Sequence, residues 1–178
     1  MWRVEAIGEG GDPSVVAQVE AIFFDSAATQ SFASETARAA YRDLWLGRYR
    51  ERCPRAFLVA NNPSGEAIGY LAGALISNRE PLPGPDYYAG FPAALIDAYP
   101  AHLHVNVRRD HRGRNVGSAL IDAFRAICRA EGISGLHAIT AAASPAAAFF
   151  VRCGLVERAT ADWRGRPLAF LARPLRGC

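Results

Sequence analysis

The stretch Val105–Leu120, VNVRRDHRGRNVGSAL, constrains this chain more than any other part of its sequence. It places an alternating strand, a turn rich in glycine and arginine, and the start of an amphipathic helix in direct succession. The first N–H groups of a helix have no acceptor within the helix, and the helix dipole adds to their attraction for phosphate or pyrophosphate. Gly113 and Gly117 lack a Cβ, so a ligand can approach the backbone closely. The stretch predicts a phosphate-binding loop; the alternative is an ordinary strand-to-helix turn with a solvated basic rim.

Other residues of this loop fit an anionic ligand. Asn115 stands where a third flexible residue would help, because asparagine adopts left-handed backbone angles more readily than most residues. Four arginines add positive charge around the turn: Arg108, Arg109, Arg112 and Arg114. All 20 basic residues of the chain are arginine, which excludes lysine Schiff-base chemistry and a phosphate-binding lysine.

Bulk properties predict one soluble domain spanning residues 1–178. No apolar run approaches the roughly 18 residues of a membrane span, and the N-terminus does not resemble a secretory signal, so we expect a cytoplasmic protein. A net charge of +3 is too small to indicate nucleic-acid binding by itself. The cysteines show neither C-x-x-C pairing nor zinc-ligand spacing to histidine, so we expect free thiols and no metal: Cys53, Cys128, Cys153 and Cys178.

The order of predicted elements indicates an α/β protein. Strands are expected at Trp2–Ile7, Ala56–Ala60, Ala67–Ile76, His102–Val107, Leu136–Ala141, Leu155–Thr160 and Pro167–Ala172. Helices are expected from Pro13, from Ser34, and over Pro92–Ala98, Val116–Arg129 and Pro145–Arg152, the last closed by Gly154. Turns or loops are expected at Gly8–Gly11, Asn61–Glu66 and Ser77–Pro85. This order predicts a mixed central sheet covered on both faces, with one parallel crossover.

The motif R-G-x-x-x-G at Arg112–Gly117, after a strand, resembles the Q/R-x-x-G-x-G/A signature of the GNAT superfamily of N-acetyltransferases. The element order over about residues 100–158 and the segment AFFVRCGL, Ala148–Leu155, are also similar to that family. Tyr99–His104 resembles a bacterial subgroup related to the acetyltransferase-like C-terminal domain of O-GlcNAcases.

The resemblance implies a sheet of six to seven strands, about four helices, and acetyl-CoA as cosubstrate. It implies pairing of the pantetheine arm with the end of the strand at Val107. The residues that it assigns to the cofactor are Val105, Val107, Arg109, Arg112, Gly113, Arg114, Asn115, Val116, Gly117, Ser118, Ser144 and Phe150.

Three positions depart from the family pattern. Asn115 replaces the central glycine of the signature, and Ala143 replaces the usual asparagine before the last helix, with Ser144 as a substitute. Phe150 falls where the family has a tyrosine whose phenol protonates the departing thiolate. Phenylalanine cannot donate that proton. General acid catalysis typically raises the reaction rate by about 10²–10⁴-fold. A thiolate is a fair leaving group by itself, and water, Tyr87 or Tyr88 are alternative donors.

Proton removal from the amine is assigned to His102 and His104. Alternation places both on one face of the strand with Asn106, and neutral imidazole accepts a proton near pH 7. The His-Leu-His pattern resembles serotonin N-acetyltransferase, displaced by one residue. The alternative is that either histidine is hydrogen-bonded in the core. Asp86, Asp97 and Asp110 are further candidates, and Tyr87, Tyr88 and Phe91 would line an acceptor pocket or cap the core.

These observations favour an N-acetyltransferase that acts on a small-molecule or peptide amine. We expect no nucleic acid or membrane partner, and the sequence is compatible with a homodimer. A catalytically silent acyl-CoA-binding or interaction module is the alternative, motivated by Phe150. A third hypothesis, an arginine-mediated nucleic-acid binder, predicts binding that weakens steeply with salt.

Overall fold

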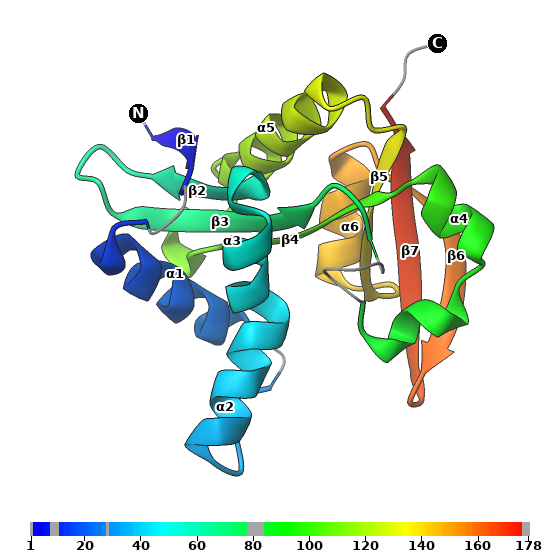
Figure 1. Cartoon of the computed structure of the whole chain (residues 1–178), viewed down its shortest axis with the longest axis horizontal. Helices are drawn as coiled ribbons and strands as arrows, with labels where there is room; N and C mark the ends of the chain where they lie inside the picture. Colours follow the sequence, from blue (N-terminus) through cyan, green and yellow to red (C-terminus); the bar gives the residue numbers. More distant parts are fainter. Residues whose placement is uncertain (1, 8–10, 28, 78–83, 176–178) are drawn as a thin grey trace. The chain divides into compact units, whose positions relative to one another are not determined.

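The computed structural model describes residues 2–7, 11–27, 29–77 and 84–175. Its strands are β1 (Arg3–Ala6), β2 (Phe57–Asn61), β3 (Ala67–Ala74), β4 (Ala101–Val107), β5 (Gly135–Ala141), β6 (Val156–Trp163) and β7 (Arg166–Pro174). In these residues they form a seven-stranded sheet in the order β1-β2-β3-β4-β5-β7-β6 (Figure 1). β4 and β5 pair in parallel, whereas β1–β2, β2–β3, β5–β7 and β6–β7 are antiparallel. The predicted mixed sheet with a parallel crossover is therefore confirmed.

The helices are α1 (Pro13–Ser26), α2 (Glu35–Arg42), α3 (Arg48–Arg52), α4 (Ala93–Ala98), α5 (Val116–Ala130) and α6 (Pro145–Arg152). Three of them begin at a side-chain cap. Asp12 accepts from the N–H of Ser14 at the start of α1, and the Ser34 and Ser144 hydroxyls cap α2 and α6. In the described part of the chain, no helix combines the length and apolar character that crossing a bilayer requires. Gly8–Gly10, residues 78–83 and Cys178 lie outside the described residues.

Two features differ from the predicted elements. The helix expected from Ser34 is interrupted by a π-helical segment, Asp43–Gly47, between α2 and α3. Apolar spacing does not distinguish a π turn from an α turn, so the sequence pattern could not predict it. The two closing strands are also longer than expected. They are joined by Arg164 and Gly165, both with positive φ (54° and 76°), as a tight right-twisted hairpin requires.

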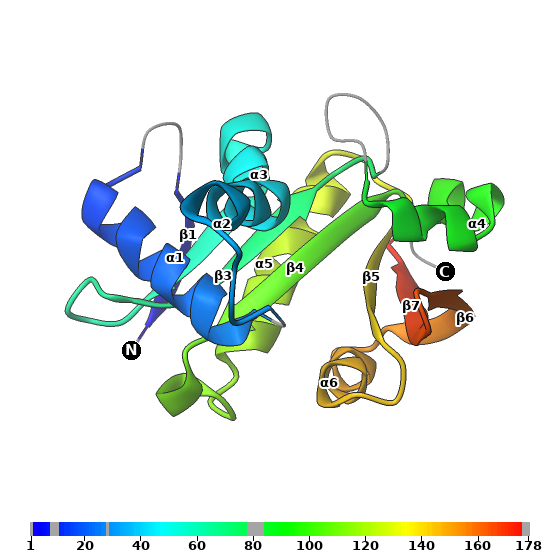
Figure 2. The ribbon, with the colours of Figure 1, turned by 90° about the horizontal axis from the view of Figure 1, so that it is seen from below.

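The chain divides into two compact units, residues 1–73 with 104–124, and residues 74–103 with 125–178. In the first unit, α1, α2 and α3 lie on one side of β1–β3 (Figure 2). Helix α5 packs on β3, since a Cβ added at Gly73 would lie 2.5 Å from the Phe124 ring. In the second unit, α6 packs on β5 and β7, and Phe91 lies against Phe170 with 5.4 Å between ring centroids.

Candidate functional site

The loop before α5 turns through two residues with left-handed backbone angles. Gly113 has a φ of 73° and Asn115 a φ of 63°, so asparagine takes the conformation that the family's glycine would allow. The Asn115 carbonyl accepts from the N–H of Ala119 and from the Ser118 hydroxyl, 3.1 and 3.0 Å away. Among the described residues, no hydrogen-bond acceptor is found for the backbone N–H groups of residues 113–118. The helix start therefore presents a series of donors suited to an anion.

Space around the loop also fits a ligand that approaches the backbone. A Cβ added at Gly113 would meet no atom within 4 Å. The first two residues of α5, Val116 and Gly117, are both buried. Gly113 is thus required by its backbone angle and leaves the loop's outer surface open, whereas Val116 attaches the helix start to the core.

Most arginines of the loop are held by neighbouring groups of the first unit. Arg108 forms an ion pair with Asp110 at 2.8 Å, and Arg109 forms one with Asp25 at 2.9 Å. The Arg112 side chain donates from Nε to the Val107 carbonyl at 3.0 Å and from an Nη to the Ser26 hydroxyl at 3.4 Å. Arg114 is exposed and has no ion pair or side-chain hydrogen bond with another described residue. Arg114 is therefore the cation of this loop that is most available to a ligand.

Sequence reasoning missed Asp25 and Ser26, which connect the end of α1 to this loop. They lie more than 80 positions away from the arginines that they bind, with separations of 84 and 86 residues. No local pattern in the sequence predicts such a pair. Through these two residues, the end of α1 is joined to the loop by two hydrogen bonds between side chains.

The end of β4 lies close to β3. Val105 and Val107 are half-buried, and a Cβ added at Gly69 would lie 3.3 Å from a methyl of Val107. The Asn106 amide donates to the Tyr70 hydroxyl at 2.7 Å, and Ile68 accepts from the N–H of Arg108. These contacts fix the strand from which the loop departs.

His104 is half-buried beside the π-helical segment and α3. Trp45 and Tyr49 meet its ring edge to face, with centroids 5.4 and 5.5 Å away, and the Tyr49 hydroxyl lies 3.2 Å from His104 Nε2. Burial lowers the pKa of His104 to about 4, with a further contribution from the Arg48 charge. The imidazole is neutral near pH 7, and it is a weak base.

His102 lies in the second unit, buried in a polar cluster with Ser77 and His137. Its Nδ1 is 2.8 Å from the Ser77 hydroxyl, which donates to the Pro100 carbonyl. His137 Nδ1 donates to a backbone carbonyl at 2.6 Å, so its Nε2 accepts from the Tyr88 hydroxyl at 2.9 Å. His102 is only 4% exposed, and these contacts are those of a hydrogen-bonded core histidine.

The last helix carries the positions at which the chain departs from the family. Ser144 accepts from the N–H of Ala147 at 3.1 Å and thereby caps α6. Ala143, which the sequence resemblance assigns to the position of the family's asparagine, has a φ of 53°, a conformation that alanine adopts at a cost. Phe150 is buried on α6, with its ring 5.4 Å from that of Phe149.

The remaining candidates have structural partners in the described chain or are exposed. Asp86 accepts from the Trp163 indole and from Arg164 at 2.8 and 2.7 Å. Hydrogen bonds from Arg108 and His111 hold the pKa of Asp110 below its ordinary value. Asp97 is exposed on α4. Tyr87, Tyr88 and Phe91 are all buried, which agrees with the interpretation that they cap the core.

Comparisons with known proteins agree with this fold. The profile of the Acetyltransferase (GNAT) family matches residues 20–155. The crystal structure of SsHAT is similar, with a TM-score of 0.74, 22% identity and 99% of each chain covered. An N-acetyltransferase from Staphylococcus aureus Mu50 has a TM-score of 0.64 and 15% identity over 99% of each chain.

A third similar structure is a complex with AcCoA. It is a GNAT superfamily phosphinothricin acetyltransferase from Sinorhizobium meliloti in complex with AcCoA, with a TM-score of 0.59 and 18% identity over 98% of this chain and 87% of that one. No curated protein matches the sequence. At these identities the similar structures show the fold alone, and the family follows from the profile.

Proposed function

Since the chain belongs to the GNAT family of acetyltransferases, we propose that it transfers an acetyl group from acetyl-CoA directly to a primary amine. The observation that carries this proposal is the series of available N–H donors at residues 113–118, at the start of α5. Such donors suit a pyrophosphate, the anionic part of coenzyme A. Members of this family acetylate amine acceptors, and the identity of the amine here is a separate question.

The residues that would hold acetyl-CoA lie at the end of β4 and in the loop. Gly113, Arg114, Asn115, Val116, Gly117 and Ser118 would face the pyrophosphate with their N–H groups or side chains. Arg109 can join them only by leaving Asp25, an ion pair between exposed groups that costs little to break. Arg112 would have to leave the Ser26 hydroxyl and the Val107 carbonyl. Val105 and Val107 would offer backbone groups to the pantetheine arm, and Ser144 and Phe150 keep the roles that the family pattern assigns to their positions.

The reaction needs the amine to lose a proton and the thiolate to gain one. The amine nitrogen attacks the thioester carbon, the C–N bond forms, and the C–S bond breaks with the electron pair leaving on sulfur. Of His102 and His104, His104 is the better proposed acceptor because it is half-buried rather than buried. With a pKa of about 4 it would hold the proton only briefly and pass it to water. The thiolate would be protonated by water, because Phe150 cannot donate.

The second candidate function is a catalytically weak or silent acyl-CoA-binding module, and Phe150 favours it. The same loop serves both functions, so binding of coenzyme A cannot separate them. The narrower likeness to relatives of the O-GlcNAcase domain, carried by Tyr99–His104, and a cytoplasmic location stay predictions.

Calorimetry with acetyl-CoA and a labelled-acetyl assay on a panel of primary amines test the proposal together. We expect binding in the micromolar range or tighter and transfer to at least one amine. Tight binding without transfer to any amine would establish the silent module instead. Failure to bind acetyl-CoA, or binding of DNA or RNA that falls steeply with salt, would contradict both.

A further inference from the structure

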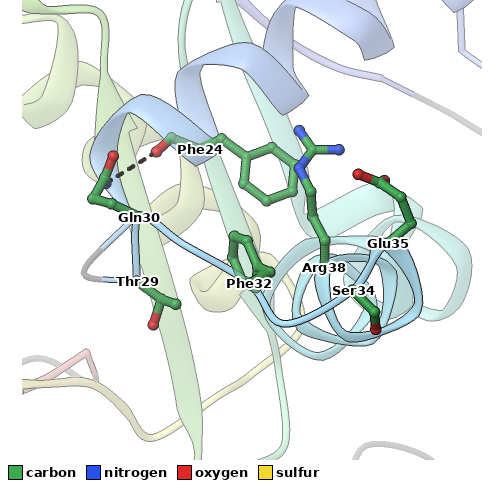
Figure 3. Close-up of a pocket in the computed structure, with 7 residues that line it drawn as sticks. All are labelled: Phe24, Thr29, Gln30, Phe32, Ser34, Glu35 and Arg38. Carbon is green, nitrogen blue, oxygen red and sulfur yellow. Dashed lines mark hydrogen bonds between the residues drawn. The ribbon is translucent and has the colours of Figure 1, made fainter.

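A cavity of about 390 Å³ lies in the first unit between the end of α1 and the start of α2. Its lining residues are Phe24, Thr29, Gln30, Phe32, Ser34, Glu35 and Arg38 (Figure 3). Nothing in the fold of the loop or in the proposed transfer step uses these side chains. The volume is in the range of sites that bind small molecules.

Arg38 lines this cavity and can bind an anion there. Its guanidinium carbon lies over the Phe24 ring, 3.8 Å from the ring centroid. A guanidinium in such a contact can still bind a carboxylate through two hydrogen bonds from its N–H groups. Arg38 forms no ion pair with another residue in the described part of the chain. The exposed Arg38 guanidinium therefore has N–H groups available to an anion in this cavity.

Glu35 supplies the opposite charge from the same helix. It stands three positions before Arg38, so the two side chains leave α2 on one face, as Figure 3 shows. No hydrogen bond or ion pair joins Glu35 to another described residue. A carboxylate at this place would bind an ammonium group of a ligand whose own carboxylate is on Arg38.

Phe24 and Phe32 give the cavity an apolar wall. Their rings meet edge to face, with centroids 6.0 Å apart. The same aromatic row continues from Phe32 to Tyr41, with centroids 5.3 Å apart. An apolar side chain of a ligand would lie against this wall while its polar end remains at α2.

We propose that this cavity binds a small zwitterionic amino acid, with its carboxylate on Arg38, its ammonium on Glu35 and its side chain against Phe24 and Phe32. The two charged groups and the apolar wall together match the three parts of such a molecule, and a simple amine or a simple acid matches only two. This site binds its ligand whether or not the chain transfers acetyl groups.

The cavity adjoins the candidate cofactor loop. Phe24 of its wall immediately precedes Asp25 and Ser26, which bind Arg109 and Arg112 of that loop. This step rests on the proposed function. It makes free amino acids the first acceptors to test for acetyl transfer. Failure of acetyl transfer to them would leave the binding site itself unaffected.

Three compounds with one carbon skeleton test the site by calorimetry on the full-length protein. L-Phenylalanine carries both charges, L-phenylalaninamide lacks the carboxylate, and 3-phenylpropionate lacks the amine. We expect phenylalanine to bind about tenfold or more tightly than either analogue, since each charged hydrogen-bonded contact contributes a factor of this order. Equal affinity for phenylalanine and phenylalaninamide, or no binding of phenylalanine while acetyl-CoA still binds, would overturn the inference.

Variants assign each charge to its residue. Arg38→Gln should reduce the affinity for phenylalanine to that for phenylalaninamide, and it should leave the affinity for phenylalaninamide unchanged. Arg38→Lys should restore part of the affinity for phenylalanine. Glu35→Gln should weaken the binding of phenylalanine about tenfold without weakening the binding of 3-phenylpropionate. Arg3→Gln, at an exposed arginine of β1 outside the cavity, is the matched control and should change none of these affinities. Equal losses with Arg3→Gln would contradict the assignment, as would unchanged binding in both cavity variants.

Discussion

The Tyr49 hydroxyl and His104 Nε2 lie 3.2 Å apart, within hydrogen-bond distance. Both groups are neutral near pH 7, because burial raises the pKa of Tyr49 to about 12 and lowers that of His104 to about 4. A neutral imidazole carries one ring proton, so the tautomer of His104 decides whether the phenol or Nε2 donates. In either tautomer the contact holds the His104 ring against Tyr49.

Stability should fall with acid because of His104. Its pKa is about 4 in the folded chain and 6.5 ordinarily, so the unfolded chain takes up the proton first as pH falls. The stability that the neutral His104 imidazole contributes is fully present above pH 6.5, and it is lost progressively as the pH falls toward 4. By pH 5 the free energy of unfolding should have dropped by about 2 kcal/mol through this group. Urea unfolding at pH 7.5 and pH 5 measures the drop.

His104→Gln is the comparison for that measurement, because glutamine does not titrate. Carboxylates and the buried histidines of the second unit change equally in both proteins, so the difference between the two drops isolates residue 104. We expect the variant to lose about 2 kcal/mol less than the wild type over this interval. An identical loss in both proteins would show that His104 titrates normally.

Much of the fold could be predicted because its signals are local. Asp12, Ser34 and Ser144 are residues that cap helices, and each caps the helix that the sequence predicts to follow it. Alternating apolar residues place the strands, although the ends of the last two were set by a hairpin turn that the pattern did not show. The π-helical segment Asp43–Gly47 has no sequence signature, and it was missed.

The candidate site is less accessible to sequence reasoning because its contacts are distant in the chain. The turn at Gly113 and Asn115 could be predicted, since their conformations depend on the residues themselves. Tyr49 is 55 positions from His104, and its hydroxyl could not be placed from a helical pattern. Arg38 and Phe24 likewise meet only through the packing of α1 and α2.

Gly113→Ala should weaken acetyl-CoA binding, and Gly132→Ala is its matched control. Both glycines have left-handed φ values, 73° and 69°, and a Cβ at either would meet no atom within 4 Å. Each substitution should therefore cost about 1–2 kcal/mol of stability through the backbone alone. Only Gly113→Ala places a methyl group where the proposed pyrophosphate approaches, and we expect about tenfold or greater loss of affinity in calorimetry. Equal affinities in the two variants would remove the loop from the cofactor site.

Ala143→Asn should stabilise the protein. Ala143 has a φ of 53°, and asparagine tolerates this region better than alanine. We expect a gain of about 0.5–1 kcal/mol in the free energy of unfolding, measured by urea denaturation. Ala142→Asn, one position earlier and without a positive φ, should give no gain. A gain of the same size at both positions would attribute the effect to polarity rather than to backbone conformation.

Phe150→Tyr should raise turnover if the chain lacks only its general acid. The sequence resemblance assigns the family's tyrosine to this position, and general acid catalysis contributes about 10²–10⁴-fold, so we expect kcat to rise by about 100-fold or more. The KM for acetyl-CoA should change little, because the added hydroxyl acts on the departing thiolate. Phe149→Tyr adds the same hydroxyl to the neighbouring ring, 5.4 Å away, and should leave kcat unchanged. A rise in neither variant, with acetyl-CoA still bound, would favour the silent module. A rise of the same size in both would indicate a general effect of polarity near α6.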